Sequence, residues 1–156
     1  MNNNDILRSL RYALNLSDPV VIDIFKLSEH EISQSYLTDI FKKEEEQGFV
    51  ELSGVELNYF LNGLIIKRRG KRNNDKTDDK KKQSTPLTNN SILKKLRIAL
   101  ELKDEDIIEI FKLENIVLSK SEISAFFRHF GHRNYKECKD QYLRNFIKGL
   151  AIRSRK

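Results

Sequence analysis

The sequence predicts an all-α protein built from two homologous small helical domains of about four helices each, joined by a flexible charged linker. Three observations predict this. Apolar residues recur at the spacing of a helical face, no segment keeps the alternation typical of a strand, and the chain matches itself at an offset of 86 residues. We therefore expect domains at 1–70 and 89–156, produced by internal duplication, and a linker at 71–88.

The duplication is visible without any gap in the alignment. Residues 4–70 pair with residues 90–156, and 24 of these 67 positions are identical. The segment 71–88 between the copies is polar and holds one apolar side chain, Leu87, so it cannot bury a core. Whether the halves form two small cores or one shared core stays open at this stage.

The first two helices of each half follow from apolar spacing and local signals. We expect one over residues 5–15, and a second that begins at Asp18 with Pro19 in its first turn. The conserved acids Asp18 and Asp104 are interpreted as helix caps.

Capping residues and apolar spacing also predict the last two helices of each half. A third helix should begin after Ser33 or Ser119, and the segment 119–122 has the capping-box pattern. An irregular loop follows it. The last helix carries apolar residues at one face in both copies: Leu57, Phe60, Leu61 and Leu64, matched by Leu143, Phe146, Ile147 and Leu150.

Two pairs of conserved residues suggest specific contacts. Gly63 and Gly149 lie inside the last helix, where glycine costs about 1 kcal/mol relative to alanine, so we expect close contact with another helix, at Ala13 or Ala99. Tolerated drift is the alternative.

The conserved acids Glu51 and Glu137 precede the last helix. We expect them to cap that helix or to form salt bridges with the conserved first-helix bases Arg11 and Arg97.

The positive charge is local. The net charge of +6 is the sum of −3 in residues 1–70, +3 in residues 71–88 and +6 in residues 89–156. In the last helix, Arg144, Lys148 and Arg155 fall within about 40° of one another at 100° per residue, away from the apolar face. Such a basic stripe suits phosphate contacts. A solvated helix face is the plainer explanation.

The segments 104–113 and 120–129 resemble a helix-turn-helix only loosely. Lys120, Ser121, Ser124, Arg128 and His129 would then face outward from the second helix. The connection between the two helices is longer than the usual 3–4 residues, so we interpret these segments as ordinary packed helices rather than as a helix-turn-helix.

Other classes of protein lack support in the sequence. There is no apolar run of about 18 residues, no signal-peptide pattern, and only one cysteine, so we expect a cytoplasmic protein that does not act on membranes. No phosphate-binding loop, dinucleotide fingerprint or zinc-protease motif occurs, so we expect neither an enzyme nor a cofactor. His129, His132 and Cys138 are the one set of metal-ligand types, too few and too loosely spaced to predict a metal site.

Several segments carry a family resemblance: residues 4–18, 48–51, 60–65, 131–138 and 143–146. Together they resemble the YehS-like bacterial family, which consists of tandem copies of the domain of unknown function numbered 1456. The resemblance implies a small bacterial cytoplasmic protein with two helical domains. It implies no activity and no functional residues. The segment 131–138 keeps the family pattern only in the second copy, which marks that loop for specialisation.

The leading hypothesis is a non-enzymatic nucleic-acid-associated binding module that uses the basic second repeat. Its candidate phosphate-binding residues are Lys120, Arg128, Arg133, Arg144, Lys148 and Arg155. The alternative is a protein-interaction adaptor or a homo-oligomerising scaffold that does not bind nucleic acid.

Overall fold

The computed structural model describes residues 1–70 and 87–155. The first half forms α1 (Asn3–Ala13), α2 (Asp18–Leu27), α3 (Gln34–Ile40) and α4 (Gly54–Arg69), and the second forms α6 (Asn89–Leu100), α7 (Asp104–Lys112), α8 (Lys120–Phe126) and α9 (Asp140–Ser154). No strand occurs in these two ranges, so the prediction of an all-α fold with four helices per repeat is confirmed. None of the helices described is long and apolar enough to cross a bilayer.

The predicted linker 71–88 lies outside the described residues except at its end. Thr88 is the N-cap of α6 and accepts a hydrogen bond from the Ser91 backbone N–H. Leu87 is partly buried against the core, with its Cβ 4.0 Å from where a Cβ on Gly54 would lie. These two residues therefore belong to the packed structure: Thr88 begins α6, and Leu87 lies beside the start of α4 in the first half.

Serine caps start the third helix of each repeat, as the sequence predicts. Ser33 accepts from the Tyr36 N–H, and Ser119 forms a full capping box with Glu122. The interpretation of Asp18 and Asp104 as caps is wrong. They are the first residues of α2 and α7, after the N-cap positions.

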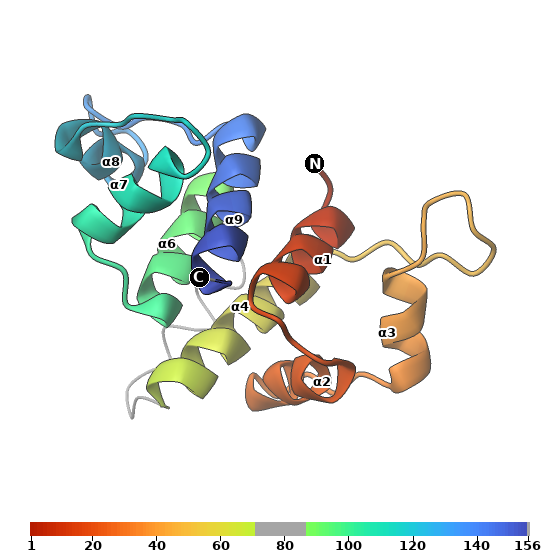
Figure 1. The fold of residues 1–156 in the computed structure, drawn as a ribbon. Helices are drawn as coiled ribbons and strands as arrows, with labels where there is room; N and C mark the ends of the chain where they lie inside the picture. The colour runs from red at the N-terminus through yellow and green to blue at the C-terminus, as the bar shows by residue number, and fades with distance from the viewer. Residues whose placement is uncertain (71–86, 156) are drawn as a thin grey trace.

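The two halves pack into each other rather than side by side. α1 contacts α9 and α6 contacts α4, while α2 packs on α4 and α7 on α9 within their own halves (Figure 1). The 86-residue offset converts α1 into α6 and α4 into α9, so both contacts between the halves are the same contact made twice. This is the isologous arrangement of a two-fold dimer, here within one chain. The buried apolar side chains form a single cluster, so the core is shared.

The two helix glycines mark close helix packing, as predicted, but their partners differ from the prediction. A Cβ on Gly63 would overlap the backbone carbonyl oxygen of Ile24 in α2 and would lie 2.8 Å from its carbonyl carbon. A Cβ on Gly149 would meet the Ile110 carbonyl of α7 in the same way. The partners are α2 and α7, not Ala13 or Ala99, because the last helix packs on the second helix of its own half.

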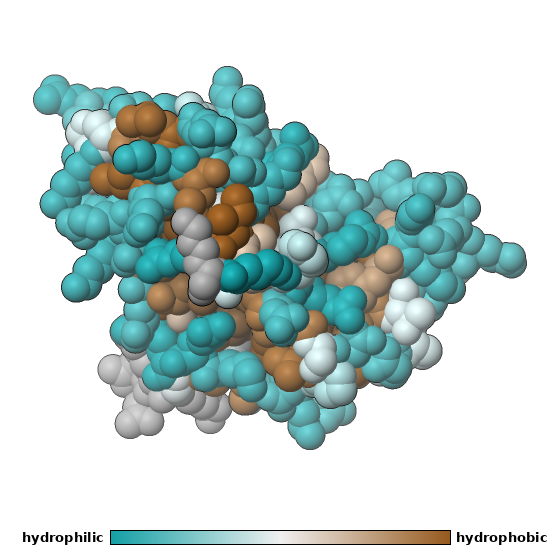
Figure 2. All heavy atoms as spheres, in the orientation of Figure 1, coloured by the Kyte–Doolittle hydropathy of each residue, from teal (hydrophilic) through white to brown (hydrophobic). Residues whose placement is uncertain are grey.

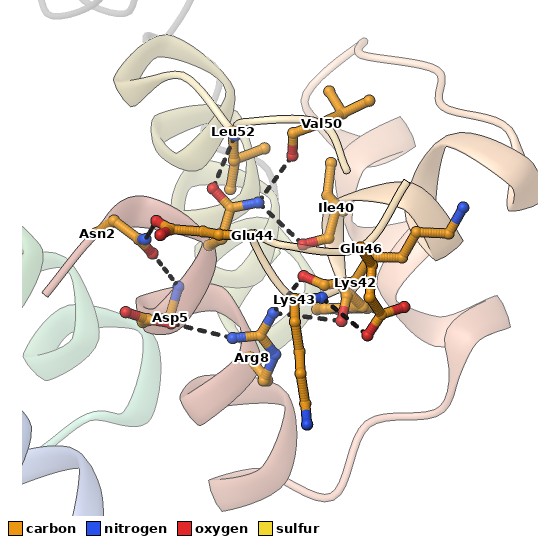
Figure 3. A network of polar contacts seen from close by, with 12 residues as sticks. Asn2, Asp5, Arg8, Ile40, Lys42, Lys43, Glu44, Glu46, Val50 and Leu52 are labelled. Carbon is orange, nitrogen blue, oxygen red and sulfur yellow. Dashed lines mark hydrogen bonds and ion pairs between the residues drawn. The ribbon is translucent and has the colours of Figure 1, made fainter. Parts of the chain in front are cut away.

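A buried asparagine joins α1 to the rest of its half. The Asn4 side chain is 2% exposed, and its amide nitrogen donates to the carbonyls of Ile40 and Val50, both at 2.9 Å. Its oxygen accepts from the Leu52 N–H at 2.9 Å (Figure 3). Asn4 therefore pairs three backbone groups that would otherwise lie buried without partners.

Asn90 makes the equivalent set of bonds in the second half. Its amide donates to the carbonyls of Phe126 and Lys136, and its oxygen accepts from the Cys138 N–H at 2.8 Å. Every partner lies 86 residues beyond its counterpart in the first half, so the duplication preserved the whole network.

We expect Gly63→Ala to destabilise the protein by about 1–3 kcal/mol, because the added methyl group overpacks against the α2 backbone. Helix propensity alone would change stability by about 1 kcal/mol in the opposite direction. Urea denaturation of the full chain measures the difference. Gly54→Ala is the matched control, since its Cβ would have no neighbour closer than 4.0 Å. Equal stability of the two variants would show that the contact at Gly63 is not tight.

We expect Asn90→Asp to cost more than a typical surface substitution. The carboxylate keeps the acceptor for the Cys138 N–H but cannot donate to the two carbonyls, and it places negative charge against them in a buried site. Each unsatisfied buried group costs about 1–3 kcal/mol. Thermal melting at neutral pH checks this against Asn134→Asp, an exposed site. Melting temperatures that fall by the same amount would argue against a structural role for Asn90.

Candidate nucleic-acid interface

The main candidate site is a groove between α1 and α9, where the two halves meet. It encloses about 630 Å³. The residues that line it are Arg8, Ser9, Tyr12, Glu114, Arg144, Ile147, Lys148, Ala151, Ile152 and Arg155. Four of these are basic and one is acidic, so the groove is positively charged. We call it the α1/α9 groove.

The α1/α9 groove combines its basic residues with apolar ones. Ala151 and Ile152 of α9 contribute aliphatic surface, and the Tyr12 ring of α1 is 65% exposed. Apolar and hydrophilic surface lie next to each other over the middle of the face drawn in Figure 2, where Figure 1 places α1 and α9. The groove therefore offers both positive charge and apolar contact.

Two of the basic residues are held in place by the fold. The Arg155 guanidinium lies 4.0 Å from the Tyr12 ring centroid and donates to the Tyr12 carbonyl at 2.8 Å. That carbonyl belongs to the last turn of α1, where a cation is favoured by the helix dipole. Arg8 forms an ion pair with Asp5 and donates to the carbonyls of Phe41 and Lys42 (Figure 3).

The other two basic residues remain available. Arg144 and Lys148 are exposed, and neither makes a hydrogen bond or ion pair with any residue that the structure describes. They lie four residues apart on α9, which places them on one side of the helix, as the sequence predicts. The third residue of the predicted stripe, Arg155, follows α9 as its C-cap. The groove thus combines two fixed cations with two that can turn towards a ligand.

The equivalent position between α6 and α4 has different chemistry. Asn58 and Asn62 occupy the places of Arg144 and Lys148, and Ile98 occupies the place of Tyr12. Lys95 donates to the Asn62 side-chain oxygen at 2.6 Å, and the Asn58 side-chain oxygen is buried without a hydrogen-bond partner. The equivalent surface is also basic, because Lys94, Lys95 and Arg69 occupy the places of Arg8, Ser9 and Arg155. The two copies therefore differ in where their cations lie and in the presence of Tyr12.

The other three predicted phosphate-binding residues do not line the groove. Lys120 is the first residue of α8, and Arg128 and Arg133 follow that helix in the loop before α9; all three are exposed. The structure thus brings Arg144, Lys148 and Arg155 together and adds Arg8, which sequence reasoning missed. Arg8 belongs to the acidic first half, and only the docking of α1 on α9 places it there.

The helix-turn-helix reading finds little support in the geometry. α8 has seven residues and ends at Phe126, so Arg128 and His129 lie beyond the helix. They cannot share a recognition face with Lys120.

The predicted bridges from Glu51 and Glu137 to the first-helix arginines are wrong. Arg11 pairs with Asp18 at 2.6 Å and Arg97 with Asp104 at 2.9 Å. Each guanidinium also lies over a phenylalanine ring, Phe41 or Phe127 in turn. The Asp and Arg that both copies share therefore stabilise the turn between the first two helices of each half.

Glu51 and Glu137 are exposed, and the caps of the last helices lie elsewhere. Ser53 is the N-cap of α4, and its side chain accepts from the Glu56 N–H. The predicted role of Glu51 in capping is therefore also wrong.

Comparison with known proteins identifies the family. The family model described as "Protein of unknown function (DUF1456)" matches residues 3–70 and again residues 89–156. The chain belongs to this family. It is 40% identical to "Uncharacterized protein YehS" of Escherichia coli (strain K12) over 153 residues, which cover 98% of this chain and 96% of that protein. No solved structure matches the chain.

The three metal-ligand types of this region, His129, His132 and Cys138, do not come together. The rings of His129 and His132 are 5.3 Å apart at their centroids, whereas Cys138 is buried. Among residues 1–70 and 87–155, no group of three or more His, Cys, Asp or Glu side chains has the geometry to hold a metal ion. Cys138 instead occupies the core position held by Leu52 in the other half.

We expect the Cys138 thiol to be unreactive in the folded protein. Burial, with the nearby charges of Asp140 and Glu137, raises the pKa of this thiol to about 12. Little thiolate then exists at pH 8, and reagent cannot reach the sulfur. Labelling with a chromogenic disulfide at pH 8 should proceed only as fast as the protein opens, and immediately in guanidinium chloride. Equal labelling rates in the two conditions would contradict the burial.

The raised pKa of the Cys138 thiol makes the free energy of unfolding depend on pH. The folded-state pKa lies above the unfolded value of about 9, so the folded state retains the proton longer. The contribution of Cys138 to stability is therefore complete below pH 9 and is lost as the pH rises towards 12.

Proposed function

We propose that this DUF1456 protein is a non-enzymatic module that binds the phosphate backbone of nucleic acid along the α1/α9 groove. The observation that carries the proposal is the convergence of four cations there, of which Arg144 and Lys148 are exposed and form no hydrogen bond or ion pair with the described residues. Basic side chains that neutralise phosphates release counterions, and this drives sequence-independent binding.

The acidic cluster of the first half lies towards the Arg8 end of the groove, because Arg8 donates to the carbonyls of Phe41 and Lys42, and it is distant from the Arg155 end. Glu44 accepts a hydrogen bond from Asn2, which precedes α1, whereas Arg155 binds Tyr12 near the other end of that helix. Ten residues of helix separate Asn2 from Tyr12, which corresponds to about 15 Å at 1.5 Å per residue. A distance of this size exceeds the screening length of about 8 Å at physiological ionic strength.

The lining of the groove supports binding rather than catalysis. It holds one carboxylate, Glu114, and neither histidine nor cysteine. General acid–base or nucleophilic chemistry requires a positioned pair of groups, which this lining does not supply. We place the module in the bacterial cytoplasm, in keeping with its single cysteine.

A protein-interaction adaptor is the second candidate. Two apolar side chains of the second half favour it, Val117 at 81% exposure and Phe130 at 88%. Capture of partners from a cell extract, with and without nuclease, separates the two functions. Partners lost on nuclease treatment support nucleic-acid binding, and partners that remain support the adaptor.

We expect oligonucleotide binding by the full chain to weaken steeply as salt rises, and the double variant Arg144→Gln, Lys148→Gln to bind more weakly. Each lost phosphate contact lowers the slope of log affinity against log salt by about 1, so this slope should fall by about 2. Fluorescence anisotropy over a salt series measures both quantities.

The control is the double variant Lys120→Gln, Arg128→Gln, which removes the same charge outside the groove. It should retain the wild-type slope. Absence of binding at low salt would contradict the proposal, and an equal loss in the control would remove the groove as the site.

A further inference from the structure

We infer that the α1/α9 groove binds a single strand of nucleic acid in preference to a duplex, with bases against its apolar surface and phosphates on its cations. This inference rests on the proposed function and names its substrate class. Its basis is the presence of two chemistries in one cavity: four cations, and the exposed apolar surface of Tyr12, Ala151 and Ile152.

A duplex could use only one of these chemistries. Its phosphates face outward and its base faces are stacked inside, so the apolar surface of the groove would contact nothing suitable. A single strand exposes the faces of its bases, and proteins bind such strands by combining aromatic stacking with a positively charged groove. A volume of about 630 Å³ lies within the range of small-molecule sites, about 300–1,000 Å³, and suits an inserted base and sugar.

Tyr12 and Arg155 form a stacked pair, with the guanidinium over one face of the ring, that is ordered before any ligand binds. The guanidinium of Arg155 lies over the Tyr12 ring and is oriented by hydrogen bonds to two carbonyls, of Tyr12 at 2.8 Å and of Ala151 at 3.1 Å. Both groups stack well on nucleobases. Because their conformations are already restricted, little further ordering is required on binding.

The equivalent position between α6 and α4 keeps basic residues but lacks the aromatic ring and the two cations of the last helix. Ile98 replaces Tyr12, and Asn58 and Asn62 replace Arg144 and Lys148. The duplicated fold should therefore carry one strand-binding site per chain and bind a short strand with 1:1 stoichiometry.

The test compares a twelve-nucleotide oligothymidine, the RNA equivalent and a duplex of the same length, with the full-length protein at matched salt. We expect both single strands to bind at least ten-fold more tightly than the duplex. Tyr12→Ser should weaken single-strand binding on the order of ten-fold or more, because it removes a stacking ring. Its salt slope should remain at the wild-type value, since no phosphate contact is lost.

Two further variants control this result. Tyr12→Phe keeps the ring and should bind like wild type, and Phe130→Ser removes an exposed ring outside the groove and should have no effect. Circular dichroism of each variant confirms that it is folded.

Each outcome has a defined meaning. Equal binding of single strands and duplex, or an unchanged affinity in Tyr12→Ser, overturns this inference and leaves the proposed function standing. Absence of binding to every oligonucleotide overturns the proposed function itself. Competition by polyglutamate as effective as by oligothymidine overturns the inference too, because the groove would then recognise charge alone, as on an acidic protein partner.

Discussion

The buried asparagine at the start of each repeat is the interaction on which this architecture depends. The first helix of each half packs chiefly on the last helix of the other half, so its apolar contacts do not hold it to its own half. Asn4 and Asn90 bond it to its own half, through three backbone groups on each side. Because these bonds are buried, breaking one leaves an unsatisfied polar group, and this specifies where the helix must lie.

A second constraint concerns the last helix. Gly63 and Gly149 allow α4 and α9 to contact the backbone carbonyls of α2 and α7 directly. This close approach fixes the second and last helices of each half as a unit, onto which the exchanged first helix docks. The result is a pseudo-two-fold protein with one continuous core, in which two surfaces are created by the same helix pairing.

The proposed function belongs to one of these two surfaces, which differ in sequence. Both are built by a first helix against a last helix, but one carries Arg144 and Lys148 and the other carries Asn58 and Asn62. Residues on the solvent side of a helix are free to change charge because they contribute little to packing. The core positions kept their apolar character, so the charged residues on these surfaces could change without loss of the fold. The site thus uses both halves, although the proposed binding chemistry comes mainly from α9.

Local patterns in the sequence were enough to determine the helices, the caps at Ser33 and Ser119, the duplication and the basic stripe on α9, since each depends on residues a few positions apart. Only the tertiary structure decided the partners. Arg11 pairs with Asp18 rather than with Glu51, and Gly63 contacts α2 rather than Ala13. Arg8 lines a groove together with residues of the opposite half. The physical reason is that both copies present the same apolar faces, so periodicity cannot tell packing within a half from packing between halves. That choice depends on how distant surfaces fit together, and the shared core and the groove both follow from it.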